Sequence, residues 1–378
     1  MDKLLKIIFS ISSINIVFQI IYFIVLTLLI NRIGDEFIAN ILYLITVSSL
    51  FSILFTHKID FYLLTVSERN KRQSIASFYM IISLVVLCIS LLFLPNIMHP
   101  IIFIGTGLSV MNINFSLFMT KESYLKANLY RQIVSVTPIA LMLYLNIAFD
   151  FILSEIQFSQ LYFLVTCTAL LENKISFTNA RKAIKYLQKK ISYIMASTPA
   201  YLIDSLFIAF VLTILKNETE IFASYMILQR YLELPIMFIA TVISTQYLKS
   251  FSDSKNKANI LYFQKITLGM ILLYLVYFLI FDAYAGDLSS GLNINNPTLY
   301  LFFILMVPIR IFANIFGGNL IIADKQNWYL SIQLIRLIFI IYIVYFSNIS
   351  IFIGFLVAQV AFFTIYGLLG IFLFKKLN

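Results

Sequence analysis

The chain has 378 residues, of which 61% are hydrophobic and only 12% are charged, and its mean hydropathy is +0.95. Soluble domains have about 45–50% apolar and about 25% charged residues, so this chain could not cover a water-facing surface. The formal net charge of +10 would indicate nucleic-acid binding only if the basic residues formed one patch, and they are spread along the chain. We therefore expect an integral membrane protein with no nucleic-acid partner.

Apolar runs of spanning length predict an all-α, polytopic fold of about twelve transmembrane helices, because one span needs about 20 apolar residues. The first run follows Lys3 and Lys6, is longer than a signal-peptide core and lacks a cleavage site, so we expect it to be retained. In chain order the predicted spans are 7–30, 37–55, 74–94, 99–119, 132–149, 157–171, 191–215, 221–247, 262–281, 298–322, 328–346 and 350–374.

The basic residues indicate the topology, because Lys and Arg near the ends of spans stay in the cytoplasm. With a cytoplasmic N-terminus, 22 of the 27 basic residues fall in inside segments, and only Arg32 and Lys216 fall in outside loops. If one early span were missed or added, every later loop would be assigned to the opposite side of the membrane. The asymmetry therefore predicts an even number of spans and two cytoplasmic termini.

A basic stretch between the sixth and seventh spans predicts the domain organisation. We expect an N-terminal six-helix bundle at 1–172, a cytoplasmic linker at 173–190 that is attracted to anionic headgroups, and a C-terminal six-helix bundle at 191–378. Segments 25–29 (VLTLL) and 211–215 (VLTIL) each close an outward-running span. Such echoes are typical of parallel repeats around a central transport pathway.

Five charged residues lie inside predicted spans: Asp204, Arg230, Glu233, Arg310 and Arg336. A charge at bilayer depth costs about 2.5–3.5 kcal/mol on insertion scales, so such residues face an aqueous cavity or a charged partner. Arg230 and Glu233 are three residues apart, so they would share a helix face and could pair there. One interpretation is that these charges only hold helices together.

The other interpretation is a transport cavity. Arginine donates in pairs to phosphate oxygens, so Arg230, Arg310 and Arg336 would bind an anionic ligand. Asp204 or Glu233 would bind a coupling cation, either a proton or sodium. In the first span Asn15 and Gln19 are i, i+4 neighbours that either line the same cavity or form hydrogen bonds between helices.

The sequence contains no motif for an enzyme or for ATP-driven transport. It lacks a Walker A loop, GxGxxG, HExxH and GxSxG. We expect no cofactor, no metal site and no catalytic residue. The energy for transport would come from an ion gradient, the substrate's own gradient or a separate subunit.

Three segments carry a family resemblance. An outer turn leads into an aromatic-Ala start between Asn217 and Tyr225, a proline ends the segment from Ala223 to Pro235, and an Ala-Asp-Lys-Gln turn closes the segment that starts at Met306. With its twelve spans and basic central linker, the chain resembles the Wzx-type polysaccharide flippases of the multidrug/oligosaccharidyl-lipid/polysaccharide (MOP) superfamily.

The resemblance implies a chamber in a bacterial inner membrane that moves undecaprenyl-diphosphate-linked oligosaccharide outward for O-antigen or capsule assembly. By this resemblance Arg230 and Arg310 would meet the diphosphate, and Asp204 or Glu233 the coupling ion. The expected partners are the lipid-linked substrate, membrane lipids, the coupling ion, and a polymerase with other glycan-assembly proteins.

Three alternatives fit the sequence less well. A cation-coupled multidrug exporter of the same superfamily would be expected to carry an acidic residue in its first span, and 7–30 has none. The related peptidoglycan-precursor flippases have fourteen spans and need a longer chain. An O-antigen polymerase, an enzyme, would have a large outer loop with arginines, whereas the outer loop from Asp282 to Thr298 has no Lys or Arg.

The topology can be tested by cysteine scanning with an impermeant thiol reagent in intact cells. We expect a cysteine in the 282–298 loop to be labelled and one in the 174–190 segment to be protected, because the basic residues hold the latter in the cytoplasm. The opposite labelling pattern would overturn the map.

Overall fold

A computed structural model of the chain describes residues 2–56, 63, 66, 68–120, 124–168, 177–188, 191–216, 219–233, 236–237, 240, 243–244, 258–288, 297–317, 320, 326–346 and 350–377. It divides into two compact units, Met1–Leu206 and Phe207–Asn378.

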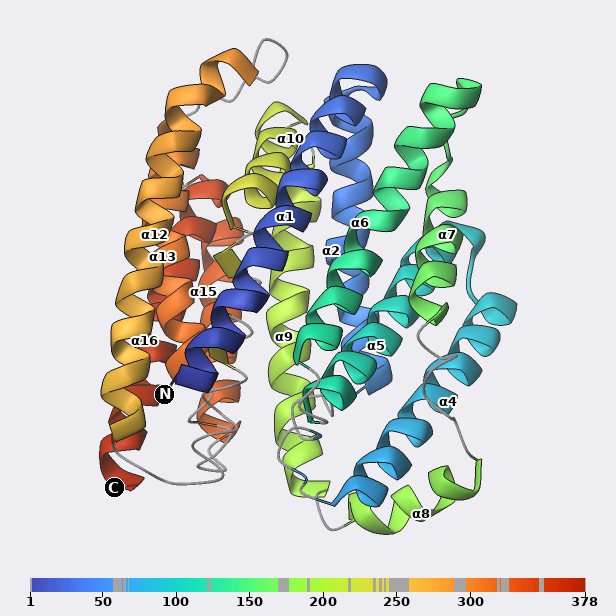
Figure 1. Ribbon diagram of the computed structural model, residues 1–378, viewed down its shortest axis with the longest axis vertical. Helices are drawn as coiled ribbons and strands as arrows, with labels where there is room; N and C mark the ends of the chain where they lie inside the picture. Colours follow the sequence, from blue (N-terminus) through green and yellow to red (C-terminus); the bar gives the residue numbers. More distant parts are fainter. Residues whose placement is uncertain are drawn as a thin grey trace. The chain divides into compact units, whose positions relative to one another are not determined.

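Helices account for nearly all of the described residues (Figure 1). The helices that start in the first unit are α1 (Asp2–Ile33), α2 (Asp35–Thr56), α4 (Arg69–Phe93), the 3-10 turn η1 (Asn96–Met98), α5 (His99–Thr120), α6 (Tyr124–Phe149), α7 (Glu155–Cys167), α8 (Phe177–Gln188) and α9 (Ile191–Leu215). Those of the second are α10 (Thr219–Leu228), the π-helical turn η3 (Gln229–Glu233), α12 (Ala258–Leu288), α13 (Pro297–Phe316), α15 (Gln326–Phe346) and α16 (Ile351–Leu377).

Each predicted span overlaps one helix, and the eighth overlaps α10 and η3 as far as Glu233, so the all-α polytopic fold is confirmed. Among the described residues, nine helices are long and apolar enough to cross a membrane. In addition, α1 contributes an apolar segment at Val17–Ile33. The 13-residue α7 matches the span that was shortest in the sequence.

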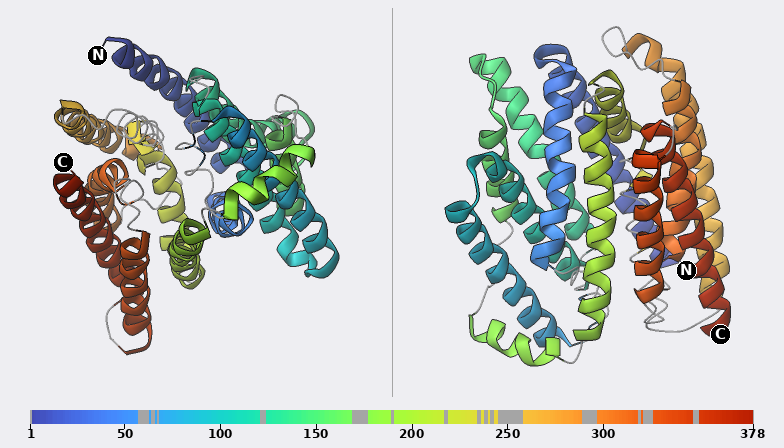
Figure 2. Two further views of the ribbon diagram at one scale, coloured as in Figure 1. Left: turned by 90° about the horizontal axis from the view of Figure 1, so that it is seen from below. Right: turned by 180° about the vertical axis from the view of Figure 1, so that it is seen from behind.

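The basic linker contains a helix that the sequence did not predict. One face of α8 is apolar and packs against α4, with Ala183 fully buried, whereas Arg181 and Lys182 are exposed. At the N-terminal end of α4 the Lys71 ammonium lies 5.4 Å from the centroid of the Tyr186 ring. Figures 1 and 2 show α8 at this end of α4.

The boundary between the compact units falls at Leu206, inside the continuous helix α9, and not in the linker. A division into bundles at 173–190 therefore remains a proposal about how the helices group.

Helix α5 is the central helix of the first unit, where it contacts α2, α4, α6 and α7. This position explains why the 99–119 span is spotted with small and polar residues. Thr106, Ser109 and Asn114 are all 0% exposed. A Cβ at Gly105 would lie 2.7 Å from the Phe51 Cβ, so glycine allows α2 and α5 to approach closely.

Local sequence sets several helix ends and bends. Gly34, with φ of +105°, forms the tight turn between α1 and α2, because a positive φ costs glycine little. Ser154 caps α7 in a capping box with Gln157. Pro138 and Pro199 lie inside helices, as the spans predicted; Pro235, another predicted helix proline, is outside the described residues.

Helices α13 and α16 pack closely in the second unit through glycines. A Cβ on Gly370 would collide with the backbone of α13, where it would lie 2.9 Å from the Gly317 nitrogen. Gly269 on α12 has nothing within 4 Å of the same position. These two glycines offer a matched pair for testing the contact.

We expect Gly370→Ala to lower the thermal unfolding temperature of the detergent-solubilised protein, because overpacking against a backbone costs about 1–3 kcal/mol. Gly269→Ala should leave the temperature unchanged or raise it, since alanine favours a helix by about 1 kcal/mol over glycine. Equal unfolding temperatures for the two variants would contradict the close α13–α16 contact.

Candidate functional site

The second unit contains a π-helical turn where α10 would otherwise continue. A π turn is wider than an α turn and changes which carbonyls find partners; such turns are frequent at functional sites. Here the Tyr277 hydroxyl donates a 2.8 Å hydrogen bond to the carbonyl oxygen of Tyr231, within η3. The turn presents two of the predicted site residues, Arg230 and Glu233.

Glu233 forms an ion pair with Arg310 that joins η3 to α13. Glu233 is 5% exposed, and the Arg310 guanidinium also lies 5.3 Å from the centroid of the Phe363 ring. Among the described residues the structure pairs Glu233 with Arg310 and not with Arg230. The i, i+3 geometry that favours an intrahelical pair applies to α turns, and the wider π turn does not keep it.

Arg336 is buried in an aromatic cage. Its guanidinium carbon lies 3.7 Å from the centroid of the Phe207 ring and 4.5 Å from that of Phe362. Its Nη1 donates a 3.1 Å hydrogen bond to Gln333 Oε1, and the Gln333 amide donates to the Tyr329 hydroxyl at 3.0 Å. At 4% exposure Arg336 is held by these contacts, so the substrate-binding role predicted for it stays a prediction.

Tyr225 is 4% exposed and lies within electrostatic range of the half-buried Arg310 and the buried Arg336. Its ring stacks on Phe303 with centroids 5.8 Å apart and meets Phe355 edge-on at 5.9 Å. The sequence did not single out these aromatic residues, although Tyr225 belongs to the aromatic-Ala segment that carries the family resemblance.

Two neighbouring side chains on η3 have buried polar atoms with no hydrogen-bond partner in the described structure: the Arg230 Nε and the Gln229 Oε1. Leaving such a group unsatisfied costs about 1–3 kcal/mol, so it indicates a place for water or a ligand. The sequence did not predict a role for Gln229, because in the second half of the chain only the charged residues stand out inside the spans. Among the side chains of the second unit whose burial the structure describes, the buried or half-buried charges are Arg230, Arg310, Arg336 and Glu233, an excess of positive charge.

The candidates in the first unit are placed differently. Gln19 is 9% exposed, and its amide donates a 3.2 Å hydrogen bond to Gln132 Oε1, joining α1 to α6. Asp204 lies half-buried on α9, where it takes part in a polar or electrostatic interaction. The Asn15 side chain lies outside the described part of the chain. The described residues contain no cluster of three or more potential metal ligands.

The ion pair can be tested by a double-mutant series on purified protein. Glu233→Gln should lower stability by about 3–5 kcal/mol, because it leaves the partly buried Arg310 uncompensated. The double variant Glu233→Gln/Arg310→Met should regain much of this loss, and Asp282→Asn, at an exposed acid on α12, should change little. Thermal unfolding is the measurement, and a double variant less stable than Glu233→Gln would argue against the pair.

Comparisons with known proteins bear on the fold. No protein-family model and no curated protein matches the chain. Among solved structures, the MATE multidrug transporter DinF-BH aligns with a TM-score of 0.69 at 12% identity, over 96% of this chain and 94% of its own.

Two further solved structures align with the chain over nearly its whole length and support the same fold. A MOP superfamily transporter from Pyrococcus furiosus aligns with a TM-score of 0.64 at 14% identity, over 98% of this chain and 96% of its own. An outward-facing multidrug resistance MATE family transporter aligns with a TM-score of 0.57 at 13% identity, over 98% and 92%. The chain is therefore a multi-pass membrane protein with the fold of the MATE transporters of the MOP superfamily.

Proposed function

We propose that the protein flips undecaprenyl-diphosphate-linked oligosaccharide from the cytoplasmic to the outer leaflet of a bacterial inner membrane, for O-antigen or capsule assembly. The supporting observation is the positive interior of the second unit around η3, where Arg230 Nε is buried without a hydrogen-bond partner. A diphosphate offers the paired oxygens that a guanidinium binds best. The product would pass to a polymerase and other glycan-assembly proteins.

Each site residue of the second unit has a different role in the proposed binding of the substrate. Arg230 is the proposed diphosphate ligand, because Glu233 pairs with Arg310 and not with Arg230, and Arg310 supports the same anion from α13. Glu233 holds Arg310 in place. Gln229, next to Arg230, offers a buried amide oxygen that could accept from a sugar hydroxyl. Arg336, enclosed by aromatic rings, contributes its positive field and, by the earlier prediction, a substrate contact.

Asp204 is the proposed coupling carboxylate. Glu233 is engaged with Arg310, which leaves Asp204, half-buried on α9, as the other mid-span acid. Binding and release of one cation there changes the local charge by one, which gives a membrane potential about 2.3 kcal/mol of leverage per 100 mV. A MATE transporter of similar fold, ClbM, was solved in complex with Rb+.

A second candidate, a multidrug exporter, is favoured by the structural neighbours that are described as multidrug transporters. A positive interior would repel cationic drugs. The Pyrococcus furiosus neighbour is described as having a binding pocket of reverse polarity that suggests a different function, so this fold is not confined to drug export.

Arg230→Ala should reduce flipping at least tenfold while the protein still inserts at a normal level, because the diphosphate loses its paired donors. Arg230→Lys should recover only part of the activity, since an ammonium cannot bind two phosphate oxygens in parallel. The assay is protection of lipid-linked oligosaccharide in reconstituted vesicles, with Arg32→Ala, at an exposed arginine, as the control. Full activity in Arg230→Ala, or dye export without glycan flipping, would refute the assignment.

The same vesicles test ion coupling under imposed proton or sodium gradients. Asp204→Asn should flip at a rate that no longer depends on the gradient, whereas Glu233→Gln should keep the dependence but give less folded protein. Wild-type flipping that ignores both gradients would show that neither acid couples transport to an ion.

A further inference from the structure

The linker helix α8 lies across the N-terminal end of α4 in the first unit (Figures 1 and 2). Its apolar face packs against α4, where Ala183 and Leu187 are buried. The opposite face, with Arg181, Ile184 and Lys185, is exposed. The helix is therefore amphipathic, and its polar face remains accessible to a ligand.

The exposed face of α8 and the first turn of α4 are strongly basic. Together they carry Arg69, Lys71, Arg72, Arg181, Lys182 and Lys185. The one acid on α4, its N-cap residue or α8 is Glu68, which is that N-cap. Because cations gathered on one surface repel one another, an anion bound among them would be stabilised.

Lys71 brings the charge of α4 close to the charges of α8. Its ammonium nitrogen lies 5.4 Å from the centroid of the Tyr186 ring. On α8, Lys182 precedes Tyr186 by one helical turn and Lys185 precedes it directly, so both lysines lie at the part of α8 that Lys71 approaches.

In the predicted topology this basic surface lies at the cytoplasmic headgroups. The segment Arg69–Phe93 is long and apolar enough to cross a membrane, so the basic first turn of α4 marks one end of a span. Ile184, between the cations of α8, is 49% exposed. This arrangement suits a helix in the membrane interface, where apolar side chains meet acyl chains and cations meet phosphates.

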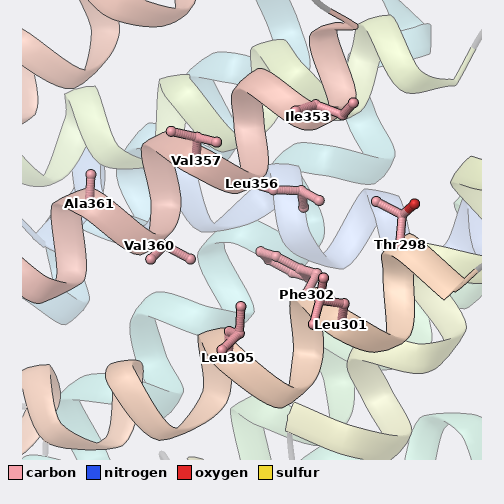
Figure 3. A pocket seen from close by; sticks show the side chains of 9 residues that line it. All are labelled: Thr298, Leu301, Phe302, Leu305, Ile353, Leu356, Val357, Val360 and Ala361. Carbon is pink, nitrogen blue, oxygen red and sulfur yellow. The ribbon is translucent and has the colours of Figure 1, made fainter.

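A groove between α13 and α16 in the second unit provides a contrast (Figure 3). It has a volume of about 460 Å³, and apart from Thr298 every side chain that lines it is a hydrocarbon. Such a surface suits acyl chains but has no charge with which to select a headgroup. The surface formed by α4 and α8 does have such charges.

We propose that α8 and the first turn of α4 form a binding site for an acidic phospholipid, in which Lys71, Lys182 and Lys185 hold the phosphate of one lipid between the two helices. The sequence alone predicts only a general attraction of the 173–190 linker to anionic headgroups. A site that includes Lys71 requires the packing of α8 on α4. The proposal is independent of the transported substrate and therefore of the flippase function.

Headgroup selection can be measured with brominated lipids, which quench a tryptophan that they contact. The chain has one tryptophan, so Trp328→Phe/Ile184→Trp places a single reporter on α8. The purified protein would be reconstituted in phosphatidylcholine vesicles with equal proportions of either brominated phosphatidylglycerol or brominated phosphatidylcholine. We expect the reporter to prefer phosphatidylglycerol by at least about fivefold, the factor that one Lys or Arg near a membrane surface contributes.

Charge-removing variants of the reporter protein test the lysines of α8. Lys182→Gln/Lys185→Gln should abolish most of the preference, because both charges face the headgroups. Lys126→Gln/Lys265→Gln is the matched control: it removes two exposed lysines from the predicted cytoplasmic ends of α6 and α12, and it should keep the preference. Equal losses in the two double variants would show a non-specific effect of net charge and overturn the site.

Lys71→Gln tests the contribution of α4. It should lower the preference, whereas Tyr186→Leu, which removes the cation–π contact but no charge, should keep it. An unchanged preference in Lys71→Gln, or an equal loss in Tyr186→Leu, would overturn the role of Lys71 as a lipid ligand.

The reporter protein also separates the other possible ligands. Equal quenching by the two brominated lipids would exclude selection of an acidic headgroup. Full suppression of the preference by inorganic phosphate at constant ionic strength would show that free phosphate is the ligand. Absence of quenching by either lipid would place α8 away from the membrane and favour an acidic cytoplasmic protein as its partner. Each of these results would overturn the proposal.

Discussion

The ion pair between Glu233 and Arg310 is the contact on which the architecture of the second unit depends. Neither residue could be kept at bilayer depth alone, because an unpaired charge there costs several kcal/mol. Together they fix the π-helical turn η3 against α13. The same pairing limits what each residue can do: Glu233 is committed to its arginine, and Arg310 enters the site with part of its charge neutralised.

The two units stabilise their buried polar groups in different ways. In the first, α5 buries small hydroxyl and amide side chains, and Ser109 donates to the carbonyl of Gly105 on its own helix at 2.9 Å. In the second, aromatic rings lie against the guanidinium groups of Arg310 and Arg336. These cation–π contacts offset part of the free energy lost when the charges leave water. Of the mid-span charges, only Asp204 belongs to the first unit.

Fold and function are therefore separate conclusions. The MATE-like fold is shared with transporters described as multidrug exporters, and a fold of this kind hosts more than one activity. The proposed function rests on the charge of the described interior of the second unit, because an excess of arginine suits an anionic substrate and opposes a cationic one.

The sequence by itself determined the helices and which charged residues lie inside them. Spans of about 20 apolar residues and the rarity of charge within them follow from the bilayer, so the helices and the mid-span charges, such as Arg230 and Arg310, could be identified by reading along the chain. It also indicated that polar pairs in α1 would either line a cavity or bond another helix. For Gln19 the structure shows a bond to Gln132.

Only the tertiary structure decided the partners. Sequence spacing predicts which side chains are neighbours only on a regular α-helix, and a π turn changes that spacing. The sequence therefore suggested Arg230 as the ion-pair partner of Glu233, whereas in the structure the partner is Arg310. The rings of Phe207 and Phe362 around Arg336 come from different helices, and nothing in local sequence brings them together. The linker helix α8 and the groove arise in the same way, because both are defined by surfaces that meet only after packing.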